Sequence, residues 1–289
     1  MGEQVGAFRS PAAEAAFVEA YREALAPPVE THDVPTSFGT TRVYRYGPSE
    51  GEPIVLLHGF NSTSAPWKPF LSAFAAANPV YAVDSLGEAG GSVQEVPFRT
   101  ATDRARALDE VLVRLGLSGV HVAGASEGGW LGTRLVVHAP DRVATLSLLE
   151  PTTVTSRYSF GVLWRALLAG LTRSDRLMRR MLVFSMGRDL LDRPDVRVAF
   201  TGVKAYRPRL PMLVPPSPDE LRAVRVPVLA LFGARNVVHD AVSAAARLGE
   251  LAPHAVVEVW PDLGHDLGQF DDTGPITDRV LRFVREHTP

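Results

Sequence analysis

Short, uninterrupted apolar runs alternate with amphipathic segments along most of the chain. The clearest runs are residues 54–57, 80–83, 120–123, 145–149, 228–232 and 256–260. Strands that are buried on both faces of a parallel sheet have this continuous apolar character. Helix-length segments with one apolar face lie between most of the runs, at residues 67–77, 100–115, 129–138, 241–251 and 276–287. The alternation predicts an α/β fold, in which a mostly parallel sheet is flanked by helices.

Two regions depart from the alternation. Near the beginning, residues 11–25 have helical spacing, and residues 31–46 alternate polar and apolar positions around Gly39, which is typical of a two-stranded hairpin. Later, the stretch 151–225 offers no core strand but several helical segments, at 160–171, 176–186 and 194–203. With the hairpin counted as two strands, this stretch follows the sixth strand. We expect it to form a helical cap over the carboxyl ends of the strands.

The predicted organisation is a core interrupted by this cap. Residues 1–151 are the first part of the core, residues 152–224 the cap (lid), and residues 225–289 the second part of the core. The active-site loops of such a sheet are expected at the carboxyl ends of its strands.

Composition narrows the classes of function. The chain has 289 residues, of which 46% are hydrophobic and 21% charged, as in an ordinary soluble protein. A net charge of -2 without a strongly basic segment argues against nucleic-acid binding. Cysteine is absent, which excludes a thiol nucleophile and thiolate metal sites. Residues 1–26 mix charges among apolar residues, and no run reaches membrane-spanning length. We therefore predict a cytoplasmic protein that does not associate with a membrane.

One segment carries most of the chemical information. Gly124-Ala125-Ser126-Glu127-Gly128 closes the apolar run 120–123 and leads into a helical segment. This G-x-S-x-G arrangement is typical of a nucleophile elbow, in which a strained strand-to-helix turn exposes the serine hydroxyl. The start of the following helix supplies free N–H groups that favour an oxyanion. Ser126 is therefore the candidate nucleophile.

The first apolar run ends in a second candidate loop, Leu57-His58-Gly59-Phe60. A glycine here permits a sharp turn, so the oxyanion hole is predicted to consist of the N–H groups of Phe60 and Glu127. His58 and Gly59 are assigned to the substrate pocket, with bracing of the loop as the alternative role for His58. Trp164, in the expected cap, is a third candidate for the pocket.

A serine needs a base to take its proton, and His265 is the best-placed of the histidines. It follows the last apolar run through a short loop, and Gly264 before it would let the ring project inward. His121 lies within a strand and is expected to be a core residue. The remaining histidines include His239, which has the pattern of a surface or helix-end position.

Together these segments resemble the α/β-hydrolase family over about residues 31–287. Residues 58–60 resemble its oxyanion loop, 124–128 its elbow, 264–265 its histidine loop, and 84–92 its D-x-x-G-x-G-x-S loop with one additional residue. Within the family, the chain is most similar to bacterial carboxylesterases with a helical cap. The resemblance implies an α/β-hydrolase fold with the cap after strand 6 and a Ser-His-acid triad without a metal or organic cofactor.

The acid is where the sequence departs from that pattern. Family members usually carry a carboxylate three residues after the glycine that ends the seventh strand, but here Asn236 follows Gly233. Glu150, which ends the sixth strand beside the strand of the serine, is the predicted acid. Asn236 could instead orient the imidazole by accepting its hydrogen bond. Asp240 is a further alternative, although its position suits the N-cap of a helix that starts at residue 241.

These residues predict a serine hydrolase that cleaves a small carboxylic ester or lactone through an acyl-enzyme on Ser126. The expected partner is this small-molecule substrate, and the protein is expected to be a monomer or homodimer. Two alternatives stay open. One is a specialised metabolite enzyme of the same fold, which would hydrolyse a C–C bond, transfer an acyl group or cyclise a substrate without a cofactor. The other is a non-catalytic ligand-binding protein.

Overall fold

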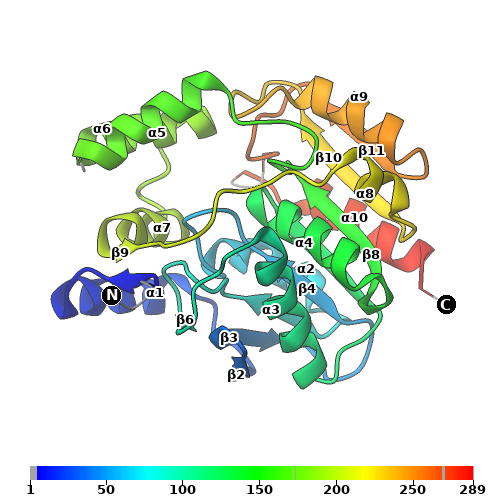
Figure 1. The fold of residues 1–289 in the computed structure, drawn as a ribbon, viewed down its shortest axis with the longest axis horizontal. Coiled ribbons are helices and arrows are strands. Elements are labelled where there is room, and N and C mark those ends of the chain that lie inside the picture. Colours follow the sequence, from blue (N-terminus) through cyan, green and yellow to red (C-terminus); the bar gives the residue numbers. More distant parts are fainter. Residues whose placement is uncertain (1–4, 173, 269–270, 289) are drawn as a thin grey trace.

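The computed structural model describes residues 5–172, 174–268 and 271–288. Within them, a nine-stranded sheet has the order β11-β10-β8-β7-β4-β5-β3-β2, and β6 pairs with β3 (Figure 1). The strands of this sheet are β2 (Glu30–Thr36), β3 (Gly39–Tyr46), β4 (Ile54–Leu57), β5 (Val80–Val83), β6 (Val93–Gln94), β7 (Val120–Ala125), β8 (Val143–Leu149), β10 (Val228–Gly233) and β11 (Val256–Trp260). The strands from β5 to β11 along this order are parallel, and β2, β3 and β6 form the antiparallel part. The predicted hairpin and mostly parallel sheet are confirmed.

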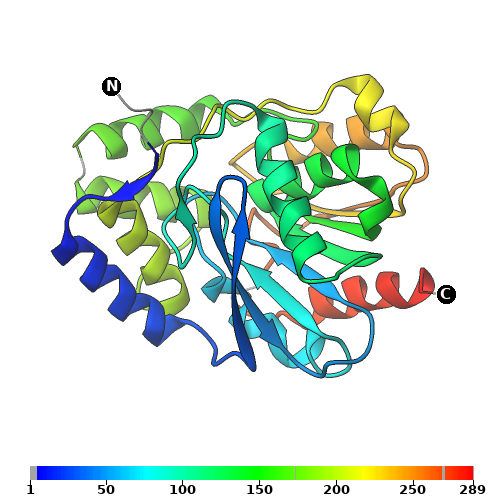
Figure 2. The same ribbon diagram turned by 60° about the horizontal axis from the view of Figure 1, so that its bottom comes forward.

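Helices cover both faces of the sheet (Figure 2). One face packs against α3 (Ala101–Arg114), α4 (Glu127–His138), α8 (Pro218–Ala223) and α9 (Ala241–Leu251). The other face packs against α1 (Pro11–Ala24), α2 (Lys68–Phe74) and α10 (Gly274–Glu286). In the described part of the chain, none of the helices combines the length and apolar character needed to cross a membrane.

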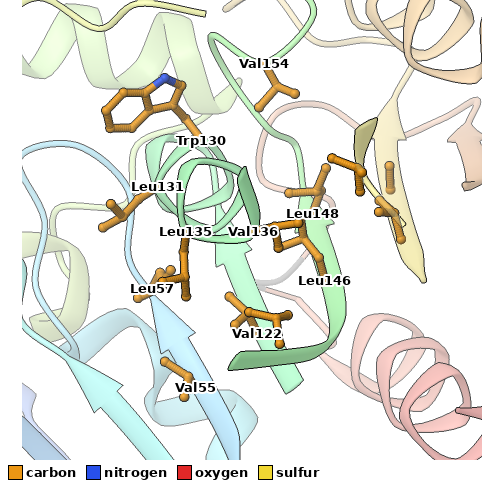
Figure 3. Packing of buried hydrophobic residues seen from close by; sticks show 14 of the residues in the cluster. Val55, Leu57, Val122, Trp130, Leu131, Leu135, Val136, Leu146, Leu148 and Val154 are labelled. Atoms are coloured by element: carbon orange, nitrogen blue, oxygen red, sulfur yellow. The ribbon is translucent and has the colours of Figure 1, made fainter. Parts of the chain in front are cut away.

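Successive side chains of a strand point to opposite faces of the sheet, so each strand contributes to the core on both sides. In β4, Val55 and Leu57 join the cluster on the α4 side, whereas Ile54 and Leu56 join the cluster on the α10 side. Figure 3 shows the first cluster, in which side chains of α4 pack against those of β4, β7 and β8. Trp130 of α4 is fully buried. Because α4 begins at the residue after Ser126, this packing fixes the base of the elbow.

The segment between β8 and β10 contains α5 (Phe160–Thr172), α6 (Asp175–Met186), α7 (Pro194–Ala205), β9 (Tyr206–Arg207) and α8. In Figure 1, α5 and α6 lie apart from the sheet helices. Two short strands that the sequence did not predict connect this segment to the beginning of the chain, since β1 (Ala7–Phe8) pairs with β9. Helix α1 packs along α7. Leu221 of α8 joins the core cluster of α4 and α9, which ties the end of the predicted cap to the core.

Candidate active site

Ser126 lies at the junction of β7 and α4 in a strained conformation, with φ 52° and ψ -115°. The flanking glycines are required by close backbone contacts. A Cβ at Gly124 would lie 2.4 Å from the carbonyl oxygen of Gly128, and a Cβ at Gly128 would lie 2.1 Å from that of Leu57. The chain therefore forms the predicted strand-turn-helix, and the positive end of the α4 dipole lies next to the serine.

His265 lies beside this hydroxyl, with its Nε2 3.2 Å from Oγ of Ser126. The histidine comes from the loop after β11, which packs closely on the end of β10. A Cβ at Gly233 would lie 2.4 Å from the carbonyl oxygen of Leu263, so only glycine leaves room for this loop. The hydrogen-bond distance lets the imidazole act as the base for Ser126.

Glu150 completes a chain of side chains that begins at the serine. Its residue is 1% exposed and has a positive φ of 49°. The Oε1 atom accepts the N–H of Gly233, and Oε2 lies 2.5 Å from Nδ2 of Asn236 and 3.0 Å from Nε2 of His239. The same Oε2 lies 3.7 Å from Nδ1 of His265, which is an ion-pair distance.

These contacts decide the charge of Glu150. Burial by itself raises the pKa of a carboxyl group, but hydrogen bonds from His239, His265 and Gly233 outweigh it and hold the pKa of Glu150 below its ordinary value. All the neutral or backbone donors come from the segment 233–239 after β10. At the position after β10 where the family resemblance led us to expect the acid, this chain carries donors to the Glu150 carboxylate at the end of β8.

Asn236 cannot play the role that the sequence left open for it. Its Oδ1 accepts the N–H of Val238 at 2.7 Å, so Nδ2 faces both Glu150 and His265. The Nδ2 atom lies 3.2 Å from Nδ1 of His265. The expectation that this asparagine accepts a hydrogen bond from the imidazole is therefore wrong, because a donor faces the ring. Asp240 is exposed and caps α9 by accepting the N–H of Ser243, as its position predicted.

The two predicted oxyanion donors are available for a ligand. Within residues 5–172, the backbone N–H groups of Phe60 and Glu127 have no hydrogen-bond partner. The loop of Phe60 approaches the serine closely, since a Cβ at Gly59 would lie 3.3 Å from Cβ of Ser126. Unpaired N–H groups beside a nucleophile can stabilise the negative oxygen of a tetrahedral intermediate.

His58 occupies its alternative role as a brace. It is buried, its Nδ1 lies 2.8 Å from the carbonyl oxygen of Gly59, and its Nε2 accepts the N–H of Ser85 at 3.0 Å. Burial lowers the pKa of His58, so the ring is neutral and Nδ1 is the donor. Trp164 is partly exposed on α5, where the guanidinium of Arg165 stacks on it. Its place in the pocket stays a prediction.

The sequence missed a buried ion cluster on the other side of the elbow. Arg104 of α3 contacts Glu127 at 2.5 Å and Glu88 at 3.3 Å, and each of the three residues is at most 4% exposed. Glu88 also accepts the N–H of Asn61, the residue after Phe60, at 2.6 Å. Arg104 therefore connects the two loops that supply the oxyanion donors. Only the pairing of distant loops reveals this cluster, because nothing in the sequence relates its members.

Two further contacts were not predicted. His239 was expected at the surface or at a helix end. It lies directly before the N-cap of α9 but is only 2% exposed, because the loop after β10 folds inward over Glu150. A chain of hydroxyls also reaches the nucleophile. Thr152 Oγ1 lies 3.4 Å from Oγ of Ser126 and 3.2 Å from the hydroxyl of Tyr158. Burial raises the pKa of Tyr158 to about 12, which keeps the phenol protonated.

Glu150, His239 and His265 also have the residue types of a metal site, since one ligand atom from each lies within 4.8 Å of the others. However, the Nδ2 donor of Asn236 points at the same carboxylate oxygen. An amide N–H at this position opposes a cation, whereas it suits an ionised carboxylate. The donor set therefore fits a hydrogen-bonded acid better than a metal ligand.

Comparisons with known proteins agree with this geometry. Residues 54–276 match the model of the alpha/beta hydrolase family, and the chain belongs to that family. It is similar to an uncharacterized carboxylesterase, nap, of Bacillus subtilis (strain 168), with 30% identity over 88% of this chain and 86% of that protein. Carboxylesterase YbfK of the same organism is 27% identical over 93% of each protein. The crystal structure of naproxen esterase (carboxylesterase NP) from Bacillus subtilis has a TM-score of 0.85 and 28% identity over 93% of this chain and 96% of that one.

Proposed function

We propose that the protein is a serine hydrolase that cleaves small carboxylic esters or lactones through an acyl-enzyme on Ser126. The observation that carries the proposal is the chain from Ser126 Oγ to His265 Nε2, and from His265 Nδ1 to Glu150 Oε2. The similarity to carboxylesterases over nearly the whole chain supports it.

Glu150 is the proposed acid because of the proton that the reaction places on the ring. When His265 takes the proton of Ser126, it becomes an imidazolium with a hydrogen on each nitrogen. The neighbour of Nδ1 must then be an acceptor, and Asn236 presents a donor there. The Glu150 carboxylate accepts this hydrogen and supplies the opposite charge.

The proposed reaction then has two halves. The Ser126 oxygen attacks the ester carbonyl, and the N–H groups of Phe60 and Glu127 hold the oxyanion while His265 protonates the leaving alcohol. Water, activated by His265, releases the acid from the serine. Each proton transfer uses side chains of this protein, so the proposal includes no metal and no organic cofactor.

We assign the acyl or alcohol side of the substrate to the cap, with residues 152–224 as its proposed extent. Helix α5 supports an apolar preference, because it exposes a row of large apolar side chains: Phe160, Leu163, Trp164, Leu167, Leu168 and Leu171. We further propose that the protein acts in the cytoplasm as a monomer or homodimer. Cell fractionation and size-exclusion chromatography test these two points.

A fluorophosphonate probe tests the proposed function most directly. The probe should label Ser126 in the wild-type protein, as read by peptide mass spectrometry, and the protein should hydrolyse p-nitrophenyl acetate. Ser126→Ala should lose the label and about 10⁴-fold or more of the turnover. A folded wild-type protein that neither labels at Ser126 nor turns over esters would favour a ligand-binding role.

A further inference from the structure

His239 is a second histidine at the Glu150 carboxylate, and its side chain is fully buried. It lies immediately before Asp240, the N-cap of α9. Its Nε2 lies 3.0 Å from Oε2 of Glu150, and its Nδ1 lies 2.9 Å from Oγ of Ser156. Both ring nitrogens therefore have polar side-chain partners, one at the end of β8 and the other at the entrance to the cap.

We propose that His239 is a positioning residue of the Ser126 site, which holds the Glu150 carboxylate ionised and turned toward His265. This role rests on the ester hydrolysis proposed above, because Glu150 is the acid of that reaction. His239 acts through Glu150, since within the described residues its ring nitrogens contact Glu150 and Ser156 and not Ser126.

The partners of the ring decide its tautomer. An ionised carboxylate only accepts hydrogen bonds, so the Nε2 of His239 carries a hydrogen and donates it to Glu150. In the neutral ring, Nδ1 is then an acceptor, and the Ser156 hydroxyl donates to it. With the ring neutral, as we propose, this donor stabilises the charge of Glu150 without cancelling it and leaves the full negative charge for the His265 imidazolium.

The geometry at Oε2 supports this division of work. The rings of His239 and His265 approach the same oxygen at 89° to each other, with their centroids 6.2 Å apart. The shorter contact, at 3.0 Å, belongs to His239, and the 3.7 Å contact belongs to His265. His239 and Asn236, whose Nδ2 lies 2.5 Å from the same atom, therefore hold the oxygen together, and His265 contacts it at the longer ion-pair distance.

Few other charges act on this group. His239 and His265 are the titratable side chains that contact Glu150, and Gly233 and Asn236 supply neutral donors from the end of β10. Asp240, from the start of α9, is exposed and adjacent to His239 in the chain, and hydrogen bonds from Ser243 are the main cause that lowers its pKa. A change in the pH profile after substitution of His239 is thus attributable to the Glu150–His265 pair.

The test compares kcat/KM for p-nitrophenyl acetate across pH in His239→Leu and His239→Gln. Leucine removes the N–H donor to Glu150, so the Glu150–His265 pair binds its first proton more readily. The acid limb should move up by about one pH unit, and kcat should fall about tenfold or more with little change in KM. Glutamine retains an N–H donor, so His239→Gln should keep the acid limb and kcat close to their wild-type values. An acid limb that stays at its wild-type position in the leucine variant overturns the proposal.

His121→Leu is the matched control. His121 is equally buried and bonds one threonine hydroxyl, Thr145 Oγ1, but it does not contact Glu150. Its loss should lower the unfolding temperature without moving the acid limb. If His239→Leu does not fold, Ser156→Ala takes its place. This variant removes the hydroxyl that sets the tautomer, and a smaller upward shift is expected, whereas an unchanged profile contradicts the proposal.

Nitrogen-15 NMR of the histidine rings separates this proposal from the proposed function, because it needs no turnover. We expect His239 to be the neutral Nε2–H tautomer at pH 7. A ring protonated on Nδ1 alone would overturn the positioning role even in an active enzyme. Absence of esterase activity together with the Nε2–H tautomer would count against the proposed function only.

Discussion

Two buried glutamates lie on opposite sides of the elbow, and their environments have opposite effects. Glu150 is 1% exposed and Glu88 is 2% exposed, so burial alone does not distinguish them. Hydrogen bonds from His239 and His265 hold the pKa of Glu150 below its ordinary value in spite of burial. Burial, together with the nearby charge of Glu127, raises the pKa of Glu88 to about 8.

The difference lies in the number of donors and in the charge of the neighbouring groups. Glu150 has three donors from residues 233–239 and a histidine beside it. Glu88 accepts the N–H of Asn61 but shares the guanidinium of Arg104 with Glu127, whose negative charge repels it. Low dielectric strengthens both the stabilisation by donors and the repulsion between like charges. The first site therefore favours a charged acid for catalysis, and the second favours a neutral acid that holds loops.

The largest expected effect is on activity, from Glu150→Gln. The substitution keeps the shape of the side chain but removes the charge that stabilises the imidazolium. We expect kcat to fall about 10⁴-fold, by analogy with loss of the triad acid elsewhere. Asn236→Ala should have a much smaller effect in the same assay with p-nitrophenyl acetate. The opposite ranking would assign the acid's role to the loop after β10.

The next-largest expected effect is on stability, from Arg104→Met in the buried cluster of Arg104, Glu88 and Glu127. Loss of the guanidinium leaves the buried acidic groups of Glu88 and Glu127 without their shared cation, which should lower the free energy of unfolding by about 3–5 kcal/mol. Urea unfolding measures this change. Arg106→Met, on the same helix but half-exposed, should cost about 1 kcal/mol or less. Equal effects of the two substitutions would contradict the importance of the buried cluster.

A third prediction concerns a double variant in which the acid is moved from position 150 to position 236. Asn236→Asp, added to Glu150→Gln, would place a carboxylate where Nδ2 now lies 3.2 Å from Nδ1 of His265. The double variant should be about tenfold or more faster than Glu150→Gln alone, because the imidazolium regains a charged acceptor. A double variant that is no faster would show that the geometry of Glu150 matters beyond its charge.

The smallest effect is the pH dependence of stability that Glu88 confers. The folded state binds a proton on Glu88 up to about pH 8, whereas the unfolded chain releases it near pH 4.3. Between these values, the free energy of unfolding should fall as pH rises, by at most about 1.4 kcal/mol per pH unit. Glu88→Gln lacks this proton, so its stability relative to the wild type should increase from pH 6 to pH 8. Urea titrations that show a constant difference would mean that Glu88 is ionised in the folded protein.

The layered fold could be predicted from the sequence because its signal is local. An apolar run of four or five residues, such as 54–57, indicates a strand that is buried on both faces. The run 256–260 is the exception, since it forms the edge strand β11 and is partly exposed. The glycines of the elbow likewise indicate close backbone contacts. A Cβ added at Gly124 or Gly128 would lie within 2.4 Å of a backbone atom. The pairing of β1 with β9 was not predicted, because each strand has only two residues and no period.

The sequence by itself predicted which residues could perform the chemistry, namely Ser126 at its elbow and His265 after the last strand, with Glu150 at the end of β8 as the preferred acid. Only the tertiary structure decided how these groups are charged and oriented. Val238 turns the amide of Asn236, His239 folds inward onto Glu150, and Arg104 divides its charge between two glutamates. The physical reason is that a strand or a turn depends on neighbouring residues, whereas the charge of a buried group depends on donors that distant segments bring to it.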